Sequence, residues 1–258
     1  MIRDVAYLED DSSPEDRLFQ IIAFRTFSRI EMWERLIAIL GHAPRIEDLT
    51  NGSFESALNQ IRDEGGKLYT GAFILCATDA YGRKLKHLNH VALFSDMFVD
   101  KKLGKKLMAA RSLKEVYDLL HEFPLMGDFM SYQTAIDLNY SPYINFSEND
   151  FTQAGPGALR GMKKVFEDFG DYSPSEIIMW MVEHQEEEFK RLGLPFHSLF
   201  GRPLHAIDAQ GLFCETDKYC REAVPELKSA RSRIKARLSP EKAAIDYFFP
   251  PKWQLDTP

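Results

Sequence analysis

Residues 150–166, DFTQAGPGALRGMKKVF, combine a glycine–proline turn with a basic helix. Gly155 and Gly157 let the backbone turn tightly and approach another molecule without an intervening Cβ, and the first N–H groups of the next helix are free to bind an anion. We expect a short apolar helix, this turn and the basic helix to form a helix-hairpin-helix that holds DNA phosphates without reading sequence. An ordinary connection between two helices is the alternative. The predicted DNA-binding residues are Gly155, Gly157, Ala158, Arg160, Gly161, Lys163 and Lys164.

Three polar residues lie at helical spacing just upstream, in residues 126–140. Gly127 ends one predicted helix and the next begins near Asp128. On that helix Gln133 and Asp137 are four residues apart and share a face with Tyr140. An amide, a carboxylate and a phenol on one face form either a solvated surface or a polar group that points into a pocket.

Charged residues also alternate with apolar ones in residues 208–221, DAQGLFCETDKYCR. If residues 212–221 are helical, Glu215, Lys218 and Arg221 fall near one face and place a carboxylate beside two cations. The alternative is an exposed Glu–Lys pair that contributes little to stability.

Arg25 and Arg29 are four residues apart in FRTFSRIEMW, and we expect them on one face of a single helix between aromatic side chains. Arginines in such surroundings suit phosphate binding. They equally suit a partly buried ion pair with Glu31 or Glu34.

The elements that must position these residues read as helices. Ser13-Pro14, Ser173-Pro174 and Ser239-Pro240 each place an N-cap serine before a first-turn proline, and Ser112 with Glu115 forms a capping box. Residues 68–77, LYTGAFILCA, fit a buried strand or a buried helix. The sequence therefore predicts an all-α fold, mainly of α-helices, in one domain over residues 1–258, with any division into two lobes near residues 193–203.

The charge of the chain is unevenly distributed. A net charge of -7 argues mildly against a nucleic-acid partner, but residues 83–111 carry eight Lys or Arg against two Asp, and residues 228–237 form a second basic stretch. Solvated helix faces are the alternative explanation for both. The three cysteines and seven histidines lack metal-binding spacing, and no apolar run approaches the ~20 residues that cross a bilayer. We predict a cytoplasmic protein in a reducing compartment, without a metal or a membrane partner.

Four segments, in order, resemble a known family: FRTFSRIEMWERL (24–36), KLYTGAFIL (67–75), MGDFMSYQTAIDLNYSPYINFSENDFTQAGPGALRGMKKVF (126–166) and DAQGLFCETDKYCR (208–221). They resemble the phage amino acid:DNA transferases, also described as α-glutamyl/putrescinyl thymine pyrophosphorylases, which are distant relatives of helix-hairpin-helix DNA glycosylases. The resemblance extends over roughly residues 19–251. It departs from the family at Ser28, where the family tends to have Asn, so Ser28 is not included among the predicted site residues.

The resemblance implies a step of thymine hypermodification with a helix-hairpin-helix DNA glycosylase-like fold. The amine of an amino acid, glycine in the phage pathways, would replace phosphate or pyrophosphate on 5-hydroxymethyluracil in double-stranded DNA, with base flipping and no cofactor besides the glycine co-substrate. If the protein is phage-encoded, it would act in the host cytoplasm.

Within the matched segments, we expect Arg25 to contact the leaving phosphate and Asp137 or Glu215 to act as the base. Two alternatives remain: a DNA glycosylase on the same scaffold and a non-catalytic DNA-binding protein. The predicted catalytic residues are Arg25, Asp137, Glu215 and Lys218. The predicted substrate-binding residues are Arg29, Gln133, Tyr140, Asp208, Gln210 and Arg221.

Overall fold

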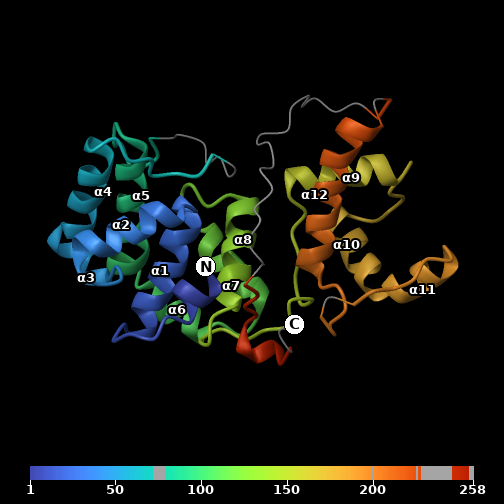
Figure 1. Ribbon diagram of the computed structural model, residues 1–258, viewed down its shortest axis with the longest axis horizontal. Coiled ribbons are helices and arrows are strands. Elements are labelled where there is room, and N and C mark those ends of the chain that lie inside the picture. The colour runs from blue at the N-terminus through green and yellow to red at the C-terminus, as the bar shows by residue number, and fades with distance from the viewer. Residues whose placement is uncertain (72–78, 199, 225, 228–245, 256–258) are drawn as a thin grey trace. The chain divides into compact units, whose positions relative to one another are not determined.

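The computed structural model describes residues 1–71, 79–198, 200–224, 226–227 and 246–255. These residues form helices and connecting segments, without a β-strand in the described part, which confirms the predicted all-α class (Figure 1). The chain divides into two compact units, Met1–Phe146 and Ser147–Pro258. Residues 193–203, where two lobes were expected to separate, lie within the second unit. None of the described helices is long and apolar enough to span a membrane.

Helix α1 supplies much of the core of unit 1, since nine of its 14 residues are buried. Phe19 of α1 packs edge-to-face on Phe54, Phe94 and Phe98, with ring centroids 5.4 to 5.7 Å away. Such aromatic contacts fix the geometry of a core as well as burying apolar area. The α-helices of unit 1 are α1 (Pro14–Phe27), α2 (Ile30–Leu40), α3 (Ile46–Asn51), α4 (Ser53–Asp63), α5 (Lys86–Phe94), α6 (Leu103–Ala109), α7 (Leu113–His121) and α8 (Asp128–Asn139). Two short π-helical segments are η1 (Ile2–Ala6) and η2 (Ser95–Asp100).

Unit 2 is built around the close contact between α9 and α12 (Figure 1). Its apolar core includes Met162 of α9, Ile178 of α10 and Phe213 of α12. The helices of unit 2 are α9 (Pro156–Val165), α10 (Pro174–Glu183), α11 (Gln185–Arg191), α12 (Ala206–Ala223) and the 3-10 helix η3 (Pro251–Trp253).

The predicted helix starts are confirmed where the structure describes them. Ser13 and Ser173 each cap a helix in a capping box, with Asp16 and Glu176 as the returning side chains. Ser112 accepts the backbone N–H of Glu115, at 3.1 Å. Ser239, the basic stretch 228–237 and residues 72–78 lie outside the described residues.

Two local predictions are wrong. The short helix expected before Gly155 is absent, since residues 151–155 are not helical. The residue before a proline disfavours the helical conformation, and the four residues before Gly155 are too few to hold a turn of their own.

Arg25 and Arg29 do not share a helix either. α1 ends at Phe27, Ser28 takes the left-handed conformation (φ 48°, ψ 42°), and Arg29 is the N-cap of α2. A left-handed residue reverses the course of the chain, so the two arginines belong to successive helices.

Candidate functional site

Arg25 and Asp137 form a two-pronged ion pair inside unit 1. Arg25 donates from Nε and Nη2 to the two carboxylate oxygens of Asp137, 112 residues along the chain. The side chain of Asp137 is 3% exposed and that of Arg25 is 24% exposed. A buried carboxylate requires such a partner, because leaving it unpaired would be costly. The structure thus joins two predicted catalytic residues by packing the last turn of α1 on α8.

The protonation of this pair is set by burial and by the mutual charge. Burial raises the pKa of the Asp137 carboxyl above its ordinary value, although the Arg25 guanidinium acts in the opposite direction. Burial also works against the charge of Arg25, but Asp137 outweighs it and raises the pKa of Arg25. Asp137 is therefore a stronger base than an exposed aspartate, beside a guanidinium that stays charged.

The other polar residues predicted on α8 lie near this pair. Tyr140 is the C-cap residue of α8 and is close enough for its charge to act on Arg25. Gln133 is half-buried one turn before Asp137. The Asp137 carboxylate is buried against Arg25, so it does not belong to a solvated surface, and whether it faces a substrate pocket stays a prediction.

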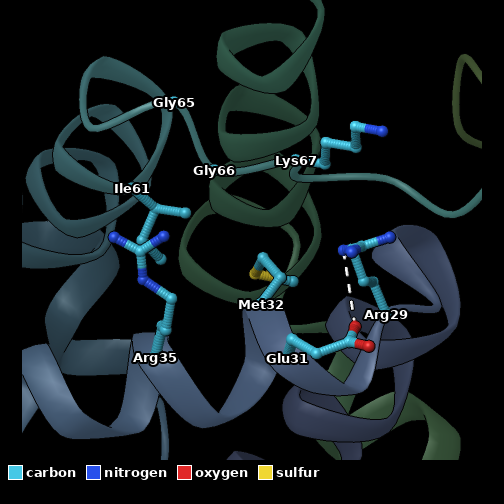
Figure 2. A pocket seen from close by; sticks show the side chains of 8 residues that line it. All are labelled: Arg29, Glu31, Met32, Arg35, Ile61, Gly65, Gly66 and Lys67. Carbon is cyan, nitrogen blue, oxygen red and sulfur yellow. Dashed lines mark ion pairs between the residues drawn. The ribbon is translucent and has the colours of Figure 1, made fainter.

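Arg29 lines a separate pocket of about 290 Å³ in unit 1. Its Nε lies 3.4 Å from Glu31, and the two side chains are 32% and 72% exposed. Of the two acids proposed from the sequence, Glu31 is the partner. Arg35 of α2 and Lys67 line the same pocket, and sequence reasoning missed both (Figure 2).

In unit 2, Asp217 is surrounded by three cations. Arg160 Nε lies 3.0 Å from Oδ2, Lys164 Nζ lies 3.0 Å from Oδ1, and Arg221 Nη2 lies 3.3 Å from Oδ2. The Asp217 side chain is 1% exposed. Burial alone would raise the pKa of Asp217, but hydrogen bonds from Lys164 and Arg160 and the charge of Arg221 hold it below its ordinary value. We call these four residues the Asp217 cluster. Sequence reasoning missed Asp217, and the one local signal for it is its four-residue spacing from Arg221.

The Asp217 cluster changes how the predicted DNA-binding residues of α9 are understood. Arg160 and Lys164 form ion pairs with the buried Asp217, whereas Lys163 is exposed on the same helix. The cluster still carries two more positive charges than negative ones, so it remains attractive to a phosphate.

The glycines of α9 serve helix packing. A Cβ on Gly161 would lie 1.8 Å from the Phe213 carbonyl oxygen, and one on Gly157 would lie 2.4 Å from Cys214 Sγ. Ala158 is buried, at 1% exposed. Gly155 is the N-cap of α9 with an ordinary negative φ. The side of each glycine that lacks a Cβ at positions 157 and 161 therefore faces α12. The sequence analysis had predicted that such glycines would face another molecule.

Glu215 and Lys218 form an ion pair on the exposed side of α12, with side chains 64% and 44% exposed. Arg221, which was expected beside them, turns to Asp217 instead. This geometry matches the surface pair that was the alternative explanation for the motif. The catalytic roles predicted for Glu215 and Lys218 stay predictions.

Asp208 and Gln210 lie in the first turns of α12. Asp208 binds Arg202 at 2.7 Å and accepts the backbone N–H of His205 at 2.9 Å, while Gln210 is 5% exposed. Asp208 thus supports the start of its own helix. Any contact with substrate must compete with these bonds.

A second group of titratable residues in unit 2 was not predicted. Glu148, 5% exposed, accepts the Trp253 indole N–H at 2.9 Å and lies 3.2 Å from His205 Nδ1. Burial lowers the pKa of Lys252 to about 8, although Glu148 acts to raise it. Glu148 precedes the turn at Gly155. The sequence near Glu148 does not predict this group, because its partners lie more than fifty residues away. Among the described residues, no group of His, Cys, Asp and Glu side chains could hold a metal ion.

The chain belongs to the family of the helical domain of 5-hmdU DNA kinases, whose model matches residues 1–229. One member of this class is the 5-hmdU DNA kinase of Bacillus phage SP10, which is 24% identical over 179 residues. The match covers 64% of this chain and 28% of that protein, so the chain spans little more than a quarter of its relative's length. No solved structure matches the chain.

Proposed function

We propose that this chain is an enzyme that modifies 5-hydroxymethyluracil in phage DNA. The family match over residues 1–229 carries the proposal, because the kinase of Bacillus phage SP10 is named for that base. More specifically, we propose that the chain transfers an amino acid, with glycine as the first candidate, onto a base that already carries phosphate or pyrophosphate.

In the proposed reaction the amine nitrogen attacks the methylene carbon attached to C5 of the base. The new C–N bond forms as the C–O bond breaks, and the electron pair leaves with the phosphate oxygen. The amine gives up one proton to a base. Such a reaction needs a cation at the departing phosphate and a carboxylate near the amine.

The Arg25–Asp137 pair supplies both groups. Nε and Nη2 of Arg25 hold Asp137, while no partner for Nη1 is found among the described residues. Nη1 is thus left to bind the departing phosphate, and the pair holds the guanidinium in place for it. The raised pKa of Asp137 suits the acceptance of a proton from the amine. In unit 2, we propose that the Asp217 cluster and Lys163 bind the DNA strand.

A second candidate function follows from the kinase relative. This helical domain would then hold 5-hydroxymethyluracil DNA for phosphoryl transfer carried out elsewhere. The present sequence contains no G-x-x-x-x-G-K-[ST] phosphate loop, the motif that cradles nucleotide phosphates in one large class of phosphotransferases. The two candidate functions differ in the group that is transferred, an amino acid or a phosphate, and this difference can be measured.

Nucleoside mass spectrometry decides between these functions. The protein is incubated with duplexes that carry 5-hydroxymethyluracil or its phosphorylated form, with glycine or with ATP. A glycine adduct on the phosphorylated duplex supports transfer, and new phosphate on the hydroxymethyl duplex supports a kinase. Free base with abasic sites indicates a glycosylase, and unchanged DNA under every condition contradicts an enzymatic role.

Variants test the roles of the pair within the same assay. Arg25→Lys keeps the positive charge but loses the forked donors, so we expect adduct formation to fall roughly 100-fold while DNA binding persists. Arg62→Lys is the matched control, because it makes the same substitution at an arginine of α4 that pairs with Asp63 and has no predicted role in the site. Equal losses in both variants would remove Arg25 from the proposed site.

A further inference from the structure

The pocket beside Arg29 has a cationic rim over an apolar floor. Arg29, Arg35 and Lys67 line it with one carboxylate, Glu31, so two positive charges are in excess. Met32, 2% exposed, and Ile61, 1% exposed, also line it from the core. In Figure 2, Arg29 and Lys67 lie on one side of Met32 and Arg35 lies on the other.

Local structure brings these side chains together. Arg29 is the N-cap of α2 and Arg35 follows in the same helix. After α4, Gly65 takes a left-handed φ of 82°, and the N–H of Gly66 bonds to the carbonyl of Ile61 at 2.8 Å. This closing turn brings Lys67 to the pocket. A Cβ on Gly66 would lie 2.7 Å from Arg35 Nη1, so the glycine leaves room for that guanidinium.

The arginines of the pocket are only loosely engaged. Arg29 pairs with Glu31, and Arg35 pairs with Glu64, whose side chain is 50% exposed. Exposed pairs of this kind contribute little free energy, so a more highly charged anion displaces them easily. No ion partner of Lys67 is found in the described part of the chain.

We infer that this pocket binds a phosphate group carrying two or more negative charges, as a phosphomonoester or pyrophosphate. Glu64 pairs with Arg35 from outside the lining, so the lining gains its full excess of two positive charges when that exposed pair opens. This excess matches such a group better than a carboxylate or a strand phosphodiester, each with one negative charge. The volume of about 290 Å³ lies at the small end for ligand sites and is sufficient for a phosphate or a pyrophosphate. The pocket lining does not include Arg25, which is proposed to contact the phosphate as it departs. The inference therefore rests on the proposed function only for the source of the anion, the phosphate or pyrophosphate once it is released from the base.

Calorimetric titration tests the pocket without DNA or glycine, so its outcome is independent of whether amino acid transfer is observed. The probes are pyrophosphate, inorganic phosphate and acetate at low salt. We expect pyrophosphate to bind most tightly and acetate not to bind. Lys67→Gln should weaken pyrophosphate binding roughly tenfold, the value of one charged hydrogen bond. Glu31→Gln should strengthen it several-fold by removing the only carboxylate of the pocket lining.

Arg62→Gln is the matched control, because Arg62 is an exposed cation of α4 that pairs with Asp63 and does not line the pocket. The affinity of Arg62→Gln for pyrophosphate should equal that of the wild type. Melting temperatures should show that all three variants fold. No binding of pyrophosphate by the wild type would overturn the inference. Equal losses in Lys67→Gln and Arg62→Gln, or displacement of pyrophosphate by an unmodified duplex, would overturn it as well.

Discussion

Asp137 in unit 1 and Asp217 in unit 2 are both buried carboxylates, yet their surroundings differ in charge. Asp137 has Arg25 as its ion-pair partner and meets it with both oxygens, so that pair is neutral. Asp217 meets Arg160, Lys164 and Arg221, so its cluster keeps two positive charges. A neutral pair tolerates apolar surroundings and preserves a guanidinium for one ligand, whereas a cationic cluster attracts a polyanion. The contrast suggests separate tasks, chemistry for the first and DNA binding for the second.

The largest expected effect is the loss of the carboxylate at the centre of the Asp217 cluster. Asp217→Asn leaves three cations facing one another, with the side chains of Lys164 and Arg221 only 6% and 9% exposed. We expect the free energy of unfolding to fall by about 3–5 kcal/mol, as for other buried ion pairs that lose one partner. Urea unfolding followed by circular dichroism measures this loss. A change below about 1 kcal/mol would show that the cluster is solvated, and the contrast with Asp137 would disappear.

The next effect concerns the contact of α9 with α12 that supports the cluster. Gly161→Ala places a Cβ against the Phe213 carbonyl, and we expect a loss of about 1–3 kcal/mol. Gly211→Ala, on α12, is the matched control because nothing lies within 4 Å of its added Cβ. Alanine is the better helix former, so the control should gain up to about 1 kcal/mol. The same urea titration gives both values, and equal signs would contradict close packing at Gly161.

The Asp217 cluster should also change how the free energy of unfolding depends on pH. The pKa of Asp217 is lower in the folded protein than its ordinary value of about 3.9 in an unfolded chain. The stabilisation by the ionised Asp217 is therefore fully present above the unfolded pKa. It is lost as the pH falls from the unfolded pKa through the lower folded pKa. We expect the wild type to lose more stability than Asp217→Asn between pH 5 and pH 3, measured by chemical unfolding at each pH. Parallel curves would show that Asp217 does not titrate as described.

The smallest expected effect lies at Ser28, the left-handed residue that ends the helix carrying Arg25. Asn adopts this conformation more readily than Ser, so Ser28→Asn should raise stability by about 0.5 kcal/mol. Differential scanning calorimetry measures the change. Adduct formation should be unaffected, because the residue's role is to turn the chain after Arg25. A large gain in activity without a gain in stability would place position 28 in the site instead.

The sequence predicted what is decided locally. Ser13, Ser112 and Ser173 cap their helices through bonds to residues three positions away, and the all-α class follows from many such starts. Arg25 and Asp137 were proposed separately, from residue type and helical spacing, but nothing in a single sequence pairs residues 112 apart.

Long-range contacts and unmarked turns account for what was missed. Asp217 pairs with Arg160, which lies 57 residues away in the sequence, and no local sequence pattern predicts that contact. The helix ends at Ser28 although no glycine or proline marks that position in the sequence. For this reason Arg25 and Arg29 were predicted to lie on one helix. Lys67 faces the pocket only because the turn at Gly65 follows α4.

The burial of Lys164 and Arg221 has a consequence for how this surface would respond to salt. A cation enclosed with its carboxylate holds no chloride ion that DNA binding could release. Among the described basic residues of α9 and the Asp217 cluster, Arg160, 29% exposed, and the exposed Lys163 are the ones that would exchange counterions with a strand. Since each phosphate neutralised on duplex DNA contributes about 0.9 to the slope of log affinity against log salt, this face alone should give a shallow slope of about 2.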